Sequence, residues 1–206
     1  MGLSHLKHLA DEARARGSSG EGSADAAELA YLAGLAKGSD VRLIAEIGFN
    51  AGFSSYTFLE ANPDVHVYSF DLGEHDYVHL AKDYIDGMFP GRHTLILGDS
   101  TQTVPEFCAS GQVPRFDLVF IDGGHSYEVA KADLHNMKGL ADSNTVLVFD
   151  DLVPWRFWGE GPTRVWQEAL QDRYVDQTLL IKDGEITATI APPGKRCWAV
   201  GRYRFE

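Results

Sequence analysis

Acidic residues follow two apolar runs in the second half of the chain: Asp122 follows residues 116–121, and Asp150 and Asp151 follow residues 145–149. Such runs are typical of buried parallel strands, whose carboxyl ends meet at one edge of a sheet. Three carboxylates brought together there repel one another unless a cation or protons compensate their charge. Oxygen ligands without cysteine suit Mg²⁺, Mn²⁺ or Ca²⁺, so we predict a metal site formed by the three aspartates. The alternative for each of them is a helix or turn cap.

His125 lies three residues after Asp122 and is the predicted general base. An imidazole titrates near neutral pH and can accept the proton of a substrate hydroxyl there. We therefore predict that Asp122 and His125 are the catalytic residues. The alternatives for His125 are a contact with the cofactor and a role in orienting its own loop.

The second candidate site is a strand, glycine turn and helix spanning residues 43–59. Its sequence E-x-G-x-x-x-G places Gly48 and Gly52 after the acidic residue Glu46. Glycines let the backbone approach a bound group closely, and the start of the helix offers amide donors and the positive end of the helix dipole. A dinucleotide site prefers G-x-G-x-x-G, so the spacing counts against an NAD-dependent oxidoreductase.

Acidic residues also end the next two predicted strands. Asp71 stands about 20 residues after the turn, a position suited to ribose hydroxyls, and Asp99 ends a third strand, where it could face an adenine amino group. Either aspartate could instead be only a helix N-cap. The three features in this order predict a cofactor that contains ribose and adenine. The residues predicted to contact it are Glu46, Gly48, Asn50, Gly52, Ser54, Asp71, Asp99, Ser100 and Asp122.

These motifs resemble those of known methyltransferases. E-x-G-x-x-x-G resembles the first motif of the class I methyltransferases that depend on S-adenosylmethionine (SAM). D-G-G-H-S-Y at residues 122–127 and the D-D pair at 150–151 resemble the metal-dependent small-molecule O-methyltransferases, closest to the branch with the cephalosporin-pathway and macrolide-sugar enzymes. The resemblance covers residues 43–152. Catechol-type relatives carry a lysine base where this chain has His125.

The resemblance implies an enzyme that transfers a methyl group from SAM to a hydroxyl of a small molecule, such as a phenol, a sugar or a natural-product intermediate. It also implies a Mg²⁺ ion, or Mn²⁺ or Ca²⁺ in its place, bound by the acidic residues after the fourth and fifth strands. The alternatives are a metal-independent methyltransferase acting on oxygen or nitrogen, and a SAM-binding protein without catalytic activity.

The elements that must position these residues alternate between strand and helix from residue 41 onward. Apolar strands separated by helices predict a parallel sheet covered on both faces. We expect an α/β, Rossmann-like, doubly wound fold with a mostly parallel seven-stranded sheet, an antiparallel C-terminal strand and a helical N-terminal extension. The expected strands are 41–47, 66–70, 94–97, 116–121, 145–149, 178–182, 185–190 and 197–203, and the expected helices are 5–16, 26–37, 52–61, 75–86, 101–109, 127–140 and 161–173.

Two segments outside the motifs could cover the site. Residues 1–40 form the N-terminal extension, broken by glycines and serines at 17–22, and residues 41–206 form the expected methyltransferase domain. We expect the extension to be a lid or a dimer contact, so a homo-oligomer is among the expected assemblies. The aromatic-rich residues 153–162 are expected to form a substrate wall or lid, or to anchor their loop to the core.

Charge and composition limit the kinds of molecule that the protein is expected to bind. The net charge is −12, and no cluster of Lys or Arg provides the basic patch that nucleic acid or an anionic membrane would need. No apolar run is long enough to span a membrane, and the N-terminus lacks the apolar core of a secretory signal. We expect a cytoplasmic enzyme that acts on a small-molecule substrate, with Cys108 and Cys197 reduced.

Overall fold

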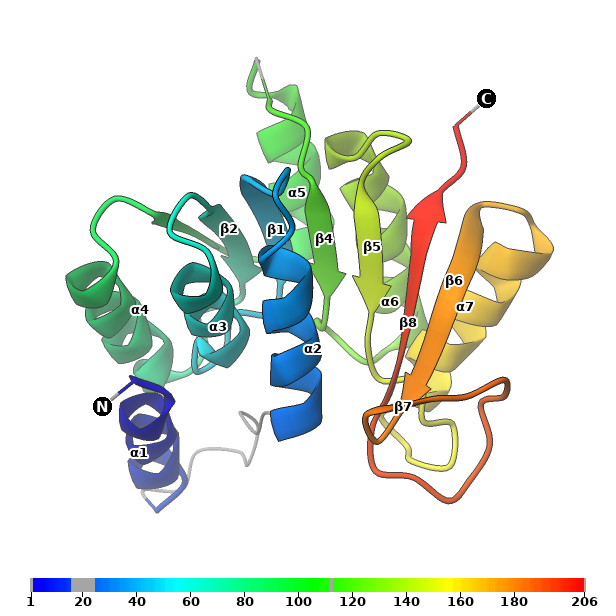
Figure 1. Cartoon of the computed structure of the whole chain (residues 1–206), viewed down its shortest axis with the longest axis horizontal. Helices are drawn as coiled ribbons and strands as arrows, with labels where there is room; N and C mark the ends of the chain where they lie inside the picture. Colours follow the sequence, from blue (N-terminus) through cyan, green and yellow to red (C-terminus); the bar gives the residue numbers. More distant parts are fainter. Residues whose placement is uncertain (1, 16–24, 112, 206) are drawn as a thin grey trace.

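The computed structural model describes residues 2–15, 25–111 and 113–205. Within these ranges, one sheet of eight strands runs through the molecule in the order β3-β2-β1-β4-β5-β8-β6-β7 (Figure 1). Neighbouring strands from β3 to β5 are parallel, whereas β8 is antiparallel to both β5 and β6. This confirms the predicted fold, but the sheet has eight strands instead of seven, because the strand expected at residues 185–190 joins its edge as the two-residue strand β7. The strands are β1 (Leu43–Ile47), β2 (His66–Asp71), β3 (His93–Leu97), β4 (Leu118–Ile121), β5 (Val146–Phe149), β6 (Val175–Lys182), β7 (Glu185–Ile186) and β8 (Cys197–Tyr203).

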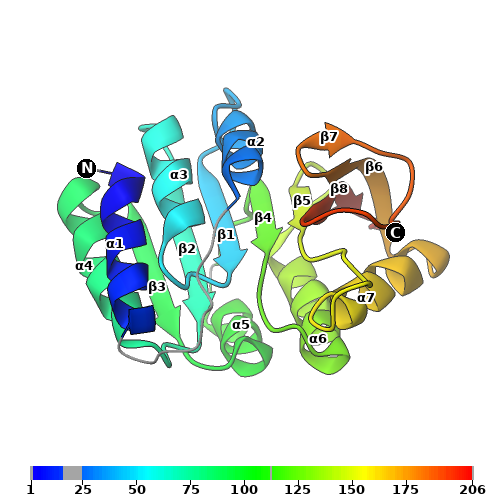
Figure 2. The same cartoon turned by 90° about the horizontal axis from the view of Figure 1, so that it is seen from below.

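Helices cover both faces of the sheet (Figure 2). Helices α1 to α4 lie over one face and helices α5 to α7 over the other, and each layer packs on its own cluster of buried apolar side chains. None of the helices in the described ranges combines the length and the apolar character that a membrane span needs. The helices are α1 (Gly2–Ala15), α2 (Ala26–Ala36), α3 (Phe53–Ala61), α4 (Asp76–Met88), α5 (Ser100–Ala109), α6 (Tyr127–Met137), the 3₁₀ turn η1 (Lys138–Leu140) and α7 (Glu160–Gln171).

The central strands end in register, which fixes where the site residues lie. All four residues of β4 are buried, as expected for a strand with helices on both sides. Ile47 of β1 pairs with Ile121 of β4, which in turn pairs with Phe149 of β5. The residues that follow these strands, one glycine and two aspartates, therefore share one edge of the sheet, toward which β4 and β5 point in Figure 1.

The two N-terminal helices are part of the core. Leu6 of α1 and Leu32 of α2 are at most 1 % exposed and belong to the same apolar cluster as buried side chains of β1, β2, α3 and α4. Asp25 caps α2 by accepting a hydrogen bond from the amide of Ala27 at 2.8 Å. The predicted break at residues 17–22 lies outside the described residues. The role of the extension as a lid or a dimer contact stays a prediction.

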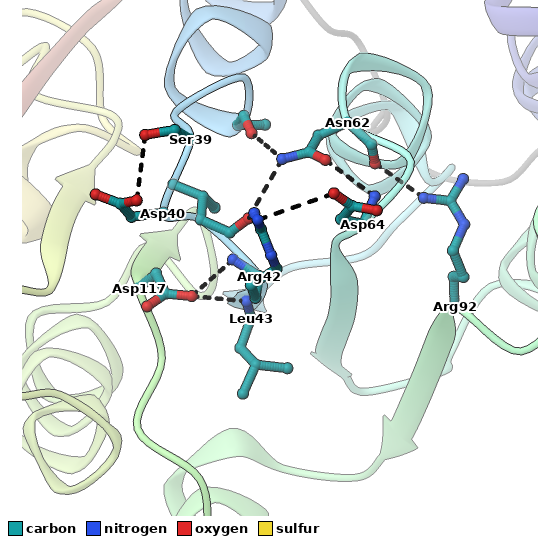
Figure 3. A network of polar contacts seen from close by, with 10 residues as sticks. Ser39, Asp40, Arg42, Leu43, Asn62, Asp64, Arg92 and Asp117 are labelled. Carbon is teal, nitrogen blue, oxygen red and sulfur yellow. Dashed lines mark hydrogen bonds and ion pairs between the residues drawn. The ribbon is translucent and has the colours of Figure 1, made fainter.

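A polar network at the opposite edge of the sheet fixes the far end of α2 (Figure 3). The side-chain amide of Asn62 donates to the carbonyls of Ala36, at the end of α2, and Val41, before β1, at 2.8 and 3.2 Å. Asp117, before β4, accepts from the backbone amides of residues 42–43 at 2.7 and 2.9 Å. These contacts hold the end of α2 and the starts of β1 and β4 together.

Candidate active site

The turn after β1 has a backbone conformation that requires glycine. Gly48 has a φ of +95° and Gly52 a φ of +76°, both in the left-handed region. A Cβ at Gly48 would lie 1.9 Å from the carbonyl oxygen of Asp122, so the turn is in direct contact with the loop after β4. Gly52 precedes α3 without a side-chain cap, so the first amides of α3 can donate to a ligand.

Glu46 lies beneath this turn and supports it. Its carboxyl group is 0 % exposed and accepts hydrogen bonds from Ser54 at 2.9 Å, from Ser69 at 2.8 Å and from Ser55. Burial raises the pKa of Glu46 to about 7, against the lowering effect of the three hydroxyl groups. Glu46 and Ser54 thus join β1, β2 and α3 below the turn, and a direct contact with the cofactor stays a prediction for both.

The predicted ribose residue, Asp71, holds the turn from the other side. Its carboxylate accepts hydrogen bonds from the backbone amides of Asn50 and Gly73, each at 2.8 Å. Leu72 and Leu97, at the ends of β2 and β3, are 59 % and 45 % exposed. The structure therefore places exposed apolar surface beside Asp71, where ribose and adenine are predicted to bind.

Asp99 and Ser100 are engaged in local hydrogen bonds at the start of α5. Asp99 is the N-cap and accepts from the amide and the hydroxyl of Thr101 at 2.9 and 2.7 Å. Ser100 donates to Asp133 at 2.7 Å. The cap is the alternative that the sequence left open for Asp99, and it leaves the predicted contact with the cofactor untested.

Asp122, His125 and Asp151 converge at the edge of the sheet. One ligand atom of each residue lies within 4.8 Å of the other two, and His125 Nε2 lies 2.8 Å from Asp151 Oδ2. Burial, with the neighbouring Asp151 carboxylate, raises the pKa of Asp122 well above its usual value. The structure thus brings two predicted metal ligands together with the predicted base, and His125 is itself near enough to serve as a ligand.

The third predicted ligand, Asp150, lines the same small pocket as Asp122, His125 and Asp151 but is not one of the three residues whose ligand atoms converge. Its nearest charged neighbours are Glu28 of α2 and Arg196, whose guanidinium lies 4.0 Å from Asp150 Oδ2 and 3.5 Å from Asp151 Oδ1. Apart from the Glu28 carboxyl, no described residue offers a hydrogen bond to either oxygen of Asp150, although Asp150 is only 2 % exposed. Burial and the Glu28 carboxyl raise the pKa of Asp150 well above its usual value. A buried carboxylate without a donor fits a site that a cation completes.

A protein-family comparison decides the class of this chain. The model of a family described as a methyltransferase domain matches residues 45–152, more than half of the sequence. The matched region contains the glycine turn and all three predicted metal ligands. The chain belongs to the methyltransferase domain family. The predicted enzyme class, a methyltransferase, is confirmed. A search of curated proteins finds no match.

Solved structures share the fold of this methyltransferase domain at low sequence identity. The cofactor-bound Rv0187 protein from MTB has a TM-score of 0.79 and 21 % identity, over 100 % of this chain and 90 % of that one. The O-methyltransferase TomG from Streptomyces achromogenes, involved in tomaymycin synthesis and solved with SAM, has a TM-score of 0.72 and 20 % identity over 96 % and 88 % of the two chains. An O-methyltransferase from Bacillus cereus in complex with SAH has a TM-score of 0.74 and 15 % identity over 97 % and 90 %.

The aromatic loop after β5 is both anchored and exposed. Trp155 donates from its indole nitrogen to the carbonyl of Gly194 at 2.9 Å, whereas the ring of Phe157 is 84 % exposed. A Cβ at Gly161 would lie 2.4 Å from the carbonyl oxygen of His125, so the start of α7 packs against the loop of the predicted base. Trp155 thus anchors this loop, one of the two predicted roles of its aromatic residues. Contact of Phe157 with a substrate stays a prediction.

Sequence reasoning missed two charged residues of the site, Glu28 and Arg196. Both are far from the motifs along the chain and reach the site only through the packing of α2 and the insertion of β8. One signal could have found Glu28, because it is the only charged residue of an otherwise mostly apolar helix. Arg196 has a comparable signal in its position directly before the buried strand β8.

Proposed function

We propose that this methyltransferase transfers the methyl group of SAM to a hydroxyl of a small molecule with the help of a divalent metal ion. One observation carries the proposal: the glycine turn and the acidic cluster adjoin, because only a glycine at residue 48 leaves room for the carbonyl of Asp122. A donor bound over the turn would lie beside an acceptor bound at the cluster. The complexes of TomG with SAM and of the Bacillus cereus enzyme with SAH support the choice of donor.

The cofactor would be held by three parts of the chain. The first amides of α3 suit the carboxylate of SAM, because they carry the positive end of the helix dipole. Asp71 would accept from the ribose hydroxyls, while Leu72 and Leu97 would contact the adenine ring. Asp99 would remain at the adenine edge while it caps α5.

The cation would be held by Asp122 and Asp151, with Asp150 and His125 at its sides. When bound, SAM supplies an electrophilic methyl group, and a divalent cation makes a nearby hydroxyl more acidic. The imidazole of His125, whose Nε2 lies 2.8 Å from Asp151 Oδ2, would take up the hydroxyl proton. Much of the rate would come from holding the two reactants in line.

A metal-independent methyl transfer is the second candidate function. Arg196 lies 3.5 Å from Asp151 and 4.0 Å from Asp150, so the chain itself supplies one positive charge to the cluster. In this alternative Arg196 and His125 would compensate the carboxylates, and activity would persist in EDTA.

Calorimetry separates these functions. SAM and SAH are expected to bind, whereas NAD is not, and SAM binding no tighter than NAD binding would refute the proposed donor. Formation of SAH can then be followed with a panel of phenols, catechols and sugars in Mg²⁺ and in EDTA. We expect turnover only with Mg²⁺, and equal turnover in EDTA would favour the metal-independent alternative.

A further inference from the structure

Helix α2 carries one charged residue, Glu28, and buries it. The helix has the sequence AAELAYLAGLA and lies outside residues 45–152, which match the family model. Glu28 is 5 % exposed. A carboxyl group buried on an apolar helix destabilises the fold unless charged or polar groups around it compensate. The neighbours of Glu28 therefore indicate why it is there.

Glu28 faces the edge where β4 and β5 end. Its carboxyl group lies within hydrogen-bonding range of the Asp150 carboxyl, and Arg196 and Asp151 are its next charged neighbours. The start of α2 is held at this edge, because a Cβ at Gly184, in the turn between β6 and β7, would lie 2.8 Å from Ala27. Figure 1 shows the start of α2 and the end of β5 at the same edge of the molecule.

Carboxyl groups outnumber cationic side chains around Glu28 within the described part of the chain. Four carboxyl groups, those of Glu28, Asp122, Asp150 and Asp151, face one guanidinium and one imidazole. Several of their oxygens are buried, and no N–H group or hydroxyl of the described residues donates a hydrogen bond to them: Glu28 Oε1, Asp150 Oδ1 and Oδ2, and Asp151 Oδ1. A divalent cation would supply both the missing charge and the missing partner for these oxygens.

We propose that Glu28 is a fourth carboxyl group of the cation site, so that cation binding fastens α2 to the ends of β4 and β5. The inference rests on the metal-assisted function proposed above and assigns part of that site to the N-terminal segment. Glu28 contributes negative charge to the cation site and positions α2 beside it. It lies outside the residues that match the family model. Loss of the Glu28 charge lowers the affinity of the site for the cation without disturbing the glycine turn.

The test compares Mn²⁺ binding, followed by electron paramagnetic resonance, in the full chain and two charge-removing variants. Glu28→Gln keeps the size of the side chain, and Glu106→Gln removes an equal charge from an exposed position on α5. We expect binding by Glu28→Gln to be about 10- to 100-fold weaker, the range found when groups that support a metal site are removed. Binding by Glu106→Gln should stay within about twofold of the parent protein. Equal affinities of the parent and Glu28→Gln would overturn the inference.

Hydrogen exchange of the unmodified protein gives a second readout that needs no variant. Mn²⁺ should slow amide exchange in α2 as well as in residues 122–125 and 150–153. Slower exchange in those loops with no change in α2 would refute the role of Glu28 and leave the metal site standing. If the parent protein binds no Mn²⁺ at all, the metal part of the proposed function fails, and this inference fails with it.

Discussion

At the scale of single residues, Asp151 meets two demands at once. Its backbone has a φ of +61°, and its carboxylate contacts both His125 and Arg196. Asparagine tolerates the left-handed region at least as well as aspartate, whereas alanine does not. Asp151→Asn therefore removes the charge and keeps the backbone.

We expect Asp151→Asn to lower kcat at least about 100-fold, because a ligand of the proposed cation and the partner of the base are lost together. The thermal midpoint should change little. The comparison variant is Asp83→Asn, which removes a charge from an exposed position on α4 and should leave kcat unchanged. Full activity of Asp151→Asn would place the chemistry elsewhere.

Glu46 makes stability depend on pH in a defined direction. Its pKa rises from 4.5 in the unfolded chain to about 7 in the fold, so the folded protein binds the proton more tightly. The stabilisation is complete below about pH 4.5 and is lost as the pH rises through 7, with an amplitude on the order of 3 kcal/mol. His93 has its pKa lowered to about 3 by burial and acts in the opposite direction, because the unfolded chain takes up its proton first.

Glu46→Gln removes the titrating carboxyl group and tests the first effect, while His93, whose Nε2 lies 2.8 Å from the Ser69 hydroxyl that also donates to Glu46, is retained. The free energy of unfolding of the variant, relative to the parent, should increase between pH 5 and pH 8 by up to about 3 kcal/mol. Urea unfolding at several pH values measures this difference. A difference that is constant with pH would show that Glu46 titrates normally in the fold.

At the scale of elements, Gly48 and Gly87 represent two opposite cases. Gly48 has a positive φ and no room for a Cβ, whereas Gly87 lies within α4 with nothing within 4 Å of its Cβ position. Gly48→Ala should abolish SAM binding and destabilise the fold by several kcal/mol, roughly the effect of strain plus a backbone clash. Gly87→Ala should instead stabilise it by about 0.5–1 kcal/mol, the gain of alanine over glycine in a helix. Calorimetry and urea unfolding of the two variants check both signs, and a stable, SAM-binding Gly48→Ala would contradict the assignment of the turn.

The ends of the strands could be predicted from the sequence more accurately than those of some other elements. The strands that carry the site end at residues 47, 121 and 149, as predicted, because an apolar run changes there to glycine or aspartate. Helix α4 runs to Met88, past its predicted end at Asp86, because the single Gly87 is tolerated inside a helix. The last hairpin is shorter on one side than predicted, since β7 consists of Glu185–Ile186 alone.

At the scale of the whole molecule, the N-terminal helices share one core with the sheet. Leu6 is 0 % exposed and packs in the cluster that also contains side chains of β1 and α3. Leu6→Ala should therefore lower the free energy of unfolding by about 2–4 kcal/mol, in a single cooperative transition. The neighbouring exposed Ser4→Ala is the control and should change it by less than about 0.5 kcal/mol. Separate transitions for α1 and the sheet would show that the extension folds independently.

The parts of the site that escaped prediction belong to this scale. Gly48, Asp122 and Asp151 can be predicted from the local sequence, since each lies directly after an apolar strand or one residue beyond it. Glu28 and Arg196 reach the site through contacts between elements far apart along the chain, and no local pattern encodes such contacts. The sequence therefore predicts well which strand ends form the candidate site, and it says little about which residues pack against them.

The position of β8 between β5 and β6 has a consequence for how the protein is made. A nascent chain that has released β1 to β6 from the ribosome still lacks the strand that pairs with both β5 and β6. Two open strand edges must stay apart until residue 203 has emerged, and during that time they are exposed to wrong pairing. The insertion of β8 also places Arg196 3.5 Å from Asp151. The backbone amide of Leu152, next to the acidic pair, donates a hydrogen bond to the carbonyl of Cys197. Synthesis of the last strand therefore also completes the candidate site, and prematurely terminated chains lack both β8 and Arg196.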